Sequence, residues 1–324
     1  MGLWIVGILA GLVVFDLLVH LAFALFAVRI FERKIPFTVT GHPPVPEAER
    51  IAFPTTGSLT LRGALYRQPV RPSRGTIVFC PELEGNHWSA LSYCRGLWEN
   101  GYDILAFDFR NQGESDHLPG YEPLHWLTDY EVGDVISSIR YARQRCDLEG
   151  DRPLGLVGIS RGGGAALAAA AKCPDVRAVA CEGAFSTRTL RMHFALRWAS
   201  LYIPEWVLKP VPMWHIRLTL NVAQWLSQKR RRCRYTKLER LLPRWRPRRV
   251  LMIAGGRDTY VHPDIAKTLC RCIGHAGAAV WIVDDAKHNR ARQVVPEEYD
   301  NRLVEFFNQS LTTARSEQAS RVSA

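Results

Sequence analysis

Apolar residues are distributed along the chain in two different patterns. Leu3 to Ala27 form an almost continuous apolar stretch that only Asp16 and His20 interrupt. From about residue 75 onward, short apolar segments of strand length alternate with longer segments of helical spacing. The expected strands are 75–80, 103–108, 153–158, 176–182, 249–254 and 278–283. The expected helices are 88–99, 129–146, 161–172, 263–273 and 297–311. This alternation predicts an α/β fold, with a mostly parallel sheet flanked by helices on both faces.

Two segments depart from this alternation. Residues 51–53 and 59–66 form an extended pair that predicts an antiparallel hairpin ahead of the parallel strands. The segment 186–247 breaks the rhythm, because it holds five Trp residues, several Pro residues and a dense basic run. The expected division of the chain is an N-terminal transmembrane anchor over 1–30, a linker over 31–48, an α/β domain over 49–311 with an insert at 186–247, and a disordered tail over 312–324.

The N-terminal apolar stretch is long enough to cross a bilayer as a helix, since each helical residue adds about 1.5 Å. A cleaved signal peptide is the alternative, and the small residues Ala22 and Ala24 suit its cleavage site. No basic side chain precedes the stretch, which favours an uncleaved single-pass anchor. Arg29, Arg33 and Lys34 follow it directly, so the positive-inside rule predicts that the body of the protein lies in the cytoplasm.

Two ionisable residues interrupt the apolar stretch. Asp16 and His20 are four positions apart, so a helix places them on one face, where they can form a hydrogen bond. An ionisable pair inside a membrane span can serve a function. Pairing with each other, or contact with another helix, is the expected role.

Composition changes this picture mainly through the distribution of charge. The chain has 324 residues, of which 47% are hydrophobic, and this suffices for one large core. Residues 188–249 hold sixteen Lys and Arg against two acids, a net charge of +14 in a chain of +11, so the remainder carries −3. The eight Cys residues form no paired framework and no zinc spacing. We therefore expect reduced thiols and no metal site.

The strongest chemical signal is the pentapeptide Gly158-Ile159-Ser160-Arg161-Gly162. It lies between an apolar segment of strand length and a segment of small residues with helical character. A Gly-x-Ser-x-Gly in that setting is typical of the sharp turn that presents a nucleophilic serine. Glycines suit the flanking positions because side chains there would collide with the neighbouring strand and helix.

A serine needs a base within hydrogen-bonding reach and a carboxylate that orients the base. Asp258 and His288 each follow an apolar strand, and the order Ser160, Asp258, His288 matches a known catalytic arrangement. In open α/β sheets, ligands bind beyond the carboxyl ends of the strands. The alternative acids are Asp284 and Asp285, which would need the loop to fold back. His262, beside the start of a predicted helix, is the alternative base.

From about Ile51 to Phe307, the chain resembles members of the α/β-hydrolase superfamily. The segment Asp108-Phe109-Arg110-Asn111-Gln112-Gly113-Glu114-Ser115 is similar to that family's D-x-R-G-x-G-x-S stretch, which shapes the loop beside the site. The resemblance implies the α/β-hydrolase fold and a lid formed by the insert. With its single apolar span, the chain looks like the membrane-anchored hydrolases that act on lipids and similar esters.

The loop after the strand 75–80 departs from the family's usual His-Gly-x pattern. By position, the backbone N–H groups of Leu83 and Arg161 would form the oxyanion hole, and backbone donors tolerate side-chain changes. Glu82 and Glu84 bring carboxylates near the developing negative charge, which is unfavourable unless they point away or pair with Arg161. These two glutamates are also candidates for binding a cationic group of the substrate.

The basic, Trp-rich insert has three interpretations. Trp side chains at headgroup depth and Arg side chains on phosphates would bind anionic lipid. Nucleic-acid binding is a second interpretation, and a solvated lid surface is the third. The N-terminal apolar stretch favours the membrane-facing lid and makes a nucleic-acid partner the least favoured.

Together, these features predict a membrane-anchored serine hydrolase that cleaves lipid-like carboxylic esters through an acyl-enzyme on Ser160, with no cofactor. Thioesters, acyl acceptors other than water and peptides share the acyl-enzyme step, so a thioesterase, an acyltransferase or a peptidase remains an alternative. A membrane-associated binding protein without catalysis is the alternative from another class.

Overall fold

The computed structural model describes residues 2–34, 41–69, 72–145, 153–202, 204–244, 248–274 and 277–322. It divides into two compact units, one formed by residues 36–187 and 235–324 and the other by residues 1–35 and 188–234. The larger unit carries the sheet. Part of the expected linker, residues 35–40, lies outside the described residues. The expected domain boundaries stay predictions.

The strands of the larger unit form one sheet. In chain order they are β1 Glu49–Thr55, β2 Leu59–Tyr66, β3 Gly75–Cys80, β4 Tyr102–Phe107, β5 Leu154–Ile159, β6 Val176–Glu182, β7 Arg249–Gly255 and β8 Ala278–Val283. Within the described residues the order across the sheet is β1-β2-β4-β3-β5-β6-β7-β8. β2 is antiparallel to β1 and β4, while the neighbours from β4 to β8 are parallel. The predicted hairpin and the mostly parallel sheet are therefore confirmed.

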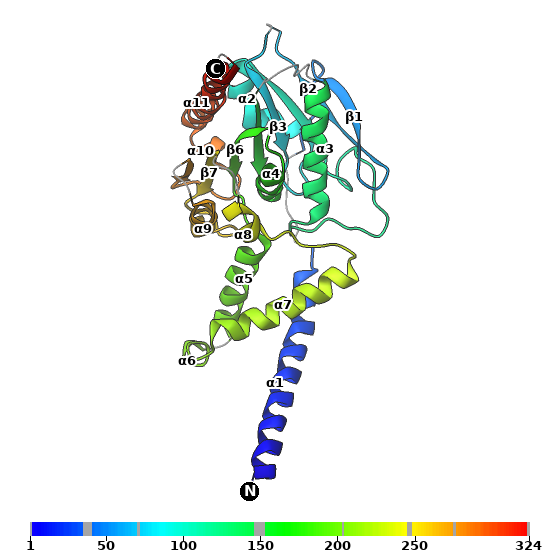
Figure 1. The fold of residues 1–324 in the computed structure, drawn as a ribbon, viewed down its shortest axis with the longest axis vertical. Coiled ribbons are helices and arrows are strands. Elements are labelled where there is room, and N and C mark those ends of the chain that lie inside the picture. The colour runs from blue at the N-terminus through cyan, green and yellow to red at the C-terminus, as the bar shows by residue number, and fades with distance from the viewer. Residues whose placement is uncertain are drawn as a thin grey trace. The chain divides into compact units, whose positions relative to one another are not determined.

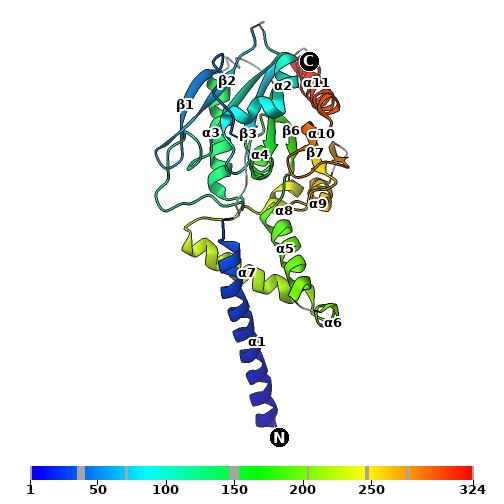
Figure 2. The same cartoon turned by 180° about the vertical axis from the view of Figure 1, so that it is seen from behind.

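Helices cover both faces of this sheet (Figures 1 and 2). The helices of the larger unit are η1 His87–Ala90, α2 Leu91–Glu99, α3 Asp129–Arg145, α4 Arg161–Lys172, α8 Leu238–Leu241, η2 Leu242–Arg244, α9 Pro263–Ile273, α10 Ala291–Val294 and α11 Pro296–Val322. α9 shows how its limits are encoded. Pro263 occupies the first turn after His262, and Gly274 ends the helix with a left-handed φ of 72°.

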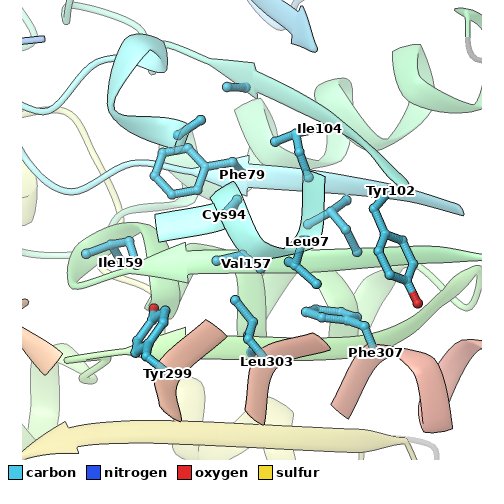
Figure 3. Close-up of a cluster of buried hydrophobic side chains, with 14 of the residues drawn as sticks. Phe79, Cys94, Leu97, Tyr102, Ile104, Val157, Ile159, Tyr299, Leu303 and Phe307 are labelled. Atoms are coloured by element: carbon cyan, nitrogen blue, oxygen red, sulfur yellow. The ribbon is translucent and has the colours of Figure 1, made fainter. Parts of the chain in front are cut away.

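α2 and α11 pack together on one face of the sheet and enclose a hydrophobic core. Figure 3 shows Tyr299, Leu303 and Phe307 of α11 directed toward the strand residues Val157 and Ile159. All five side chains are almost completely buried. Burial of a side chain of this size stabilises the folded state by about 1.5–3 kcal/mol. The packing of α11 therefore helps to hold the sheet that carries the candidate site.

α11 extends to Val322 and so reaches into the segment for which the sequence predicts disorder. Side chains after Leu311 lie outside the described ones. The expected disordered tail over 312–324 therefore stays a prediction.

The smaller unit contains the N-terminal helix and most of the insert. Its helices are α1 Gly2–Phe31, α5 Thr187–Tyr202, α6 Glu205–Leu208 and α7 Met213–Arg230. Leu3–Phe31 has a mean hydropathy of 2.4 and is the one described segment long and apolar enough to cross a membrane, although a signal sequence fits the same description. α7 crosses α1 (Figure 1), and Ala24, Val28 and Ala223 form the apolar centre of that contact.

The insert leaves and rejoins the larger unit at one place. The hydroxyl of Thr187 donates a hydrogen bond to the carbonyl oxygen of Leu127 at 3.5 Å. The backbone N–H of Thr236 donates to the same oxygen at 3.1 Å. The two ends of the insert therefore lie close together. The expected role of the insert as a lid stays a prediction.

Candidate active site

Ser160 occupies the turn between β5 and α4. Its backbone has φ 53° and ψ −118°, a conformation that L residues with side chains rarely adopt. Its N–H donates to the carbonyl oxygen of Glu182 in β6 at 2.7 Å, and its carbonyl oxygen accepts from Gly164 N at 3.2 Å. The strained residue is thus held from the adjacent strand and from the helix that follows it.

Two glycines of the pentapeptide make this turn possible by their lack of a side chain. A Cβ at Gly162 would lie 2.3 Å from the carbonyl oxygens of Cys80 and Pro81. A Cβ at Gly158 would lie 2.6 Å from Gly163 Cα. Both obstacles are backbone atoms, so they cannot move aside as a flexible side chain would. The collision expected from the sequence is present on both sides of the serine.

Ser160, His288 and Asp258 form a continuous chain of hydrogen bonds. Ser160 Oγ lies 3.0 Å from His288 Nε2, and His288 Nδ1 lies 2.6 Å from Asp258 Oδ2. The second oxygen of Asp258 accepts from the backbone N–H groups of Tyr260 and Val261, each at 2.8 Å. A carboxylate that accepts from Nδ1–H leaves Nε2 with a lone pair that can accept a hydrogen bond from the serine hydroxyl.

The three residues come from loops at the same edge of the sheet. β5 ends at Ile159, β7 ends at Gly255 and β8 ends at Val283. A Cβ at Gly255 would lie 2.4 Å from Ala286 O, so the loops after β7 and β8 pack backbone to backbone. This close approach brings Asp258 and His288 within hydrogen-bonding distance.

The alternative acid and base have other contacts. Asp285 forms an exposed ion pair with Arg257 at 2.8 Å. His262 lies at the N-terminus of α9, where its ring accepts from Asp264 N at 3.3 Å.

The serine opens onto a cavity of about 300 Å³. Leu83, Tyr93, Phe185 and Tyr260 supply apolar surface to its lining, together with Arg290 and other polar residues. Among the described residues, no group of three metal-ligating side chains lies at this cavity. A cavity that mixes apolar walls with a few convergent polar groups suits a small organic substrate.

The two expected oxyanion donors belong to residues that line this cavity. Leu83 and Arg161 both contribute to the lining, as the sequence order suggests. The Arg161 side chain does not pair with Glu82 or Glu84 in the loop after β3. Its guanidinium donates to Leu124 O at 2.8 Å and lies 3.5 Å from the carboxylate of Glu131, with both side chains buried.

The two glutamates of this loop have different environments. Glu84 is exposed, has a φ of 64° and does not line the cavity. Glu82 is 8% exposed and lines the cavity, and its Oε2 is buried with no hydrogen-bond partner. Burial raises the pKa of the Glu82 carboxyl, which Tyr93 and the charges of His288 and Arg290 only partly oppose. Of the two candidate substrate-binding residues, only Glu82 faces the cavity.

A second buried carboxyl, that of Glu182, is not among the site residues that the sequence predicts. Burial raises its pKa to about 7, against hydrogen bonds from Ala291 N and Tyr299 that lower it, and the charge of Glu82 raises it further. Ala291 N donates to Glu182 Oε1 at 2.8 Å. The available signal was an acid at the end of the apolar strand 176–182, next to a glycine. That glycine, Gly183, has φ 61°, and a Cβ there would lie 2.9 Å from the His288 ring.

The family-like stretch after β4 organises the neighbouring loop. Asp108 accepts from His87 N at 2.6 Å and from Glu114 N at 2.8 Å. Its carboxylate also lies 2.9 Å from His87 Nδ1. Arg110 forms a buried ion pair with Asp134 at 2.6 Å. These contacts connect the loop that carries Glu82 to the end of β4.

Known proteins share the fold of this chain. A family model described as the alpha/beta hydrolase fold matches residues 75–209. The structure is similar to an esterase of Pyrococcus furiosus, with a TM-score of 0.62 and 19% identity over 86% of this chain and 98% of that chain. It is also similar to the esterase domain of a Rhodothermus marinus protein, with a TM-score of 0.54 and 19% identity over 82% and 99% of the two chains. A hydrolase from Pseudomonas aeruginosa gives a TM-score of 0.55 and 16% identity over 82% and 99%. No curated protein matches the chain.

Proposed function

Because this chain has the α/β-hydrolase fold, we propose that it is a serine hydrolase that cleaves carboxylic esters through an acyl-enzyme on Ser160. The observation that carries the proposal is the relay from Ser160 Oγ to His288 Nε2 at 3.0 Å and from His288 Nδ1 to Asp258 at 2.6 Å. The relay opens onto a cavity large enough for an acyl group or a leaving group. The named esterases among the similar structures agree with this class of reaction.

In the proposed reaction, Ser160 Oγ attacks the ester carbonyl carbon while His288 Nε2 accepts the serine proton. Asp258 holds the imidazole in the required tautomer and stabilises the imidazolium. The N–H groups of Leu83 and Arg161 stabilise the negative charge on the carbonyl oxygen. His288 then protonates the leaving alcohol. Water, deprotonated by His288, releases the acyl group from the serine.

Glu82 acts in this proposal as a neutral neighbour of the oxyanion. An ionised carboxylate beside developing negative charge would raise the barrier. The raised pKa of Glu82 keeps its carboxyl protonated to higher pH than usual. The buried, unpartnered Oε2 is then available to the substrate, because it faces the cavity.

The favoured substrates are lipid-like esters at a membrane. The cavity lining includes Leu83, Tyr93, Phe185 and Tyr260, which suit an acyl chain. The apolar helix α1 would act as an uncleaved single-pass anchor, and the basic residues after it favour a cytoplasmic catalytic domain. Exposed Trp198, Trp206, Trp214 and Trp225 in the insert suit a lipid interface.

The direct test is active-site labelling of the full-length protein in detergent. We expect wild-type protein to react with a fluorophosphonate probe and to hydrolyse a panel of nitrophenyl and glycerol esters. Ser160→Ala should lose both the label and at least a thousandfold of the turnover, because it lacks the nucleophile.

Ser92→Ala is the matched control. Ser92 lines the same cavity and lies 3.3 Å from a His42 ring nitrogen, so it is also a serine paired with a histidine. It should keep the label and most of the turnover. A wild-type protein that takes no label would contradict catalysis by this serine. A labelled protein that prefers thioesters or peptides over esters would contradict only the substrate class.

A further inference from the structure

A polar cluster joins α1 and α7 within the smaller unit, and none of its residues lines the catalytic cavity. Asp16 and His20 come from α1, and His215 comes from α7. His215 Nε2 lies 2.9 Å from Asp16 Oδ1, and His20 Nε2 lies 3.6 Å from Asp16 Oδ2. The two imidazole rings are 4.1 Å apart between centroids. The donor atoms of all three residues lie within 4.8 Å of one another.

His20 is oriented toward this cluster by its other ring nitrogen. Its Nδ1 lies 2.5 Å from the Thr219 hydroxyl on α7. The Thr219 hydroxyl in turn donates to His215 O at 3.4 Å, so it can accept from His20 Nδ1–H. His20 is 4% exposed, and its Nε2 is buried with no hydrogen-bond partner. With the proton on Nδ1, a buried lone pair on Nε2 is directed at the carboxylate.

The separations of the ligand atoms suit a tetrahedral ion. With zinc bonds of about 2.0–2.1 Å, tetrahedral angles place neighbouring ligand atoms roughly 3.3 Å apart. The separations of 2.9 Å and 3.6 Å in this cluster lie on either side of that value. Two imidazoles and one carboxylate also form a donor set that prefers zinc-like transition ions to Mg²⁺ or Ca²⁺.

We propose that Asp16, His20 and His215 bind one Zn²⁺ ion, with a fourth position left for water. The ion takes the place of the proton that lies between His215 Nε2 and Asp16 in the metal-free cluster, and that proton moves to Nδ1 or is released. Thr219 is a positioning residue, because it fixes the ring of His20 and does not touch the ion.

Zinc at this position would tie α7 to α1. Toward the C-terminal end of α1, the contact between the helices is built from small and aliphatic residues, namely Ala24, Val28 and Ala223. Such packing has few directional contacts, so a metal bridge would add the fixed register that the apolar surface lacks. The inference does not depend on the proposed esterase activity, since none of its residues lines the catalytic cavity.

The test is metal binding to tag-free, full-length protein in detergent after treatment with a chelator. Zn²⁺ is titrated in competition with a chromophoric chelator, and Co²⁺ is titrated with its visible absorption recorded. We expect one Zn²⁺ per chain, a tetrahedral Co²⁺ spectrum and no competition from Mg²⁺. Asp16→Asn and His215→Gln should each weaken Zn²⁺ binding at least tenfold. Thr219→Val should weaken it about ten- to hundredfold.

The matched control is His262→Gln. His262 also lies beside a carboxylate, with Nδ1 3.3 Å from Asp264, but it is exposed and belongs to no group of three metal-ligating side chains among the described residues. Its variant should bind Zn²⁺ as the wild type does. Circular dichroism and fluorophosphonate labelling of each variant check folding separately. Full binding by both Asp16→Asn and His215→Gln would overturn the proposal, and so would a wild type that binds no Zn²⁺, since the cluster would then be only a hydrogen-bonded link between helices.

Discussion

The buried carboxyl of Glu182 should make the stability of the sheet depend on pH. Glu182→Gln is the perturbation, because glutamine keeps the size of the side chain and a carbonyl acceptor for Ala291 N while it cannot ionise. In the native protein, burial raises the pKa of Glu182 to about 7 from 4.5. Unfolding exposes the group to water and restores its ordinary pKa.

The sign of the effect follows from which state binds the proton. Between pH 4.5 and 7 the native carboxyl keeps a proton that the unfolded chain has lost, so stability falls as the pH rises. The contribution is fully present below about pH 4.5 and is lost above about pH 7. A shift of 2.5 pKa units at 1.36 kcal/mol per unit gives a total of about 3 kcal/mol. The glutamine side chain has no such dependence.

Urea unfolding followed by circular dichroism from pH 4.5 to 8 measures this difference. The free energy of unfolding of Glu182→Gln, relative to wild type, should rise by about 3 kcal/mol across that range. Histidines titrate in both proteins, so their contribution largely cancels in the difference. Glu84→Gln changes an exposed carboxyl and should run parallel to wild type. Parallel curves for Glu182→Gln and wild type would refute the reasoning, because the buried carboxyl would then ionise as it does in water.

Three further outcomes follow from the site. Wild type should lose kcat as rising pH passes the raised pKa of Glu82, and Glu82→Gln should abolish that loss. A pH–rate profile with exposed Glu84→Gln as control measures this, and an unchanged profile would contradict the role of Glu82. Gly162→Ala should lower the free energy of unfolding by about 3 kcal/mol or abolish folding, because its Cβ would lie 2.3 Å from two carbonyl oxygens. Gly133→Ala in α3 is the control, because its Cβ would meet nothing nearer than 3.7 Å. In denaturant titrations it should be neutral or stabilising by up to about 1 kcal/mol. Asp258→Asn should lower kcat by about ten-thousandfold in ester hydrolysis while the fold is kept, because the amide favours the wrong His288 tautomer.

The sheet could be predicted from the sequence because its signals are local. Strands such as 176–182 are short apolar segments bounded by polar or turn residues, and their limits agree with β6 to the residue. The helix expected over 88–99 differs in its first turn, which is the 3₁₀ segment η1 with Asn86 accepting from Trp88 N at 3.1 Å. That difference reflects a capping choice that apolar spacing does not encode.

The candidate site likewise has residues that local signals predict and contacts that only tertiary packing creates. Ser160, Asp258 and His288 follow strand ends, so chain order was enough to predict which residues would meet. The partner of Arg161 was not predictable, because Glu131 lies on α3 and reaches Arg161 only through tertiary packing. The contact of His215 with Asp16 and His20 could not be predicted for the same reason, since nearly 200 residues separate His215 from Asp16 in the sequence. The sequence indicated only that the pair on α1 would contact each other or another helix.

The attachment of the insert at Leu127 has a consequence for engineering this chain. Thr187 and Thr236 donate to the same carbonyl oxygen, so the two ends of the intervening segment are attached to the sheet-bearing unit side by side. A short glycine loop can close that gap at little entropic cost. A shortened chain that begins at residue 41, with such a loop in place of 188–234, would lose the apolar helix and most of the net charge of +11. Another protein domain could be inserted at the same attachment point in place of the insert, with β6 and β7 still adjacent in the sheet.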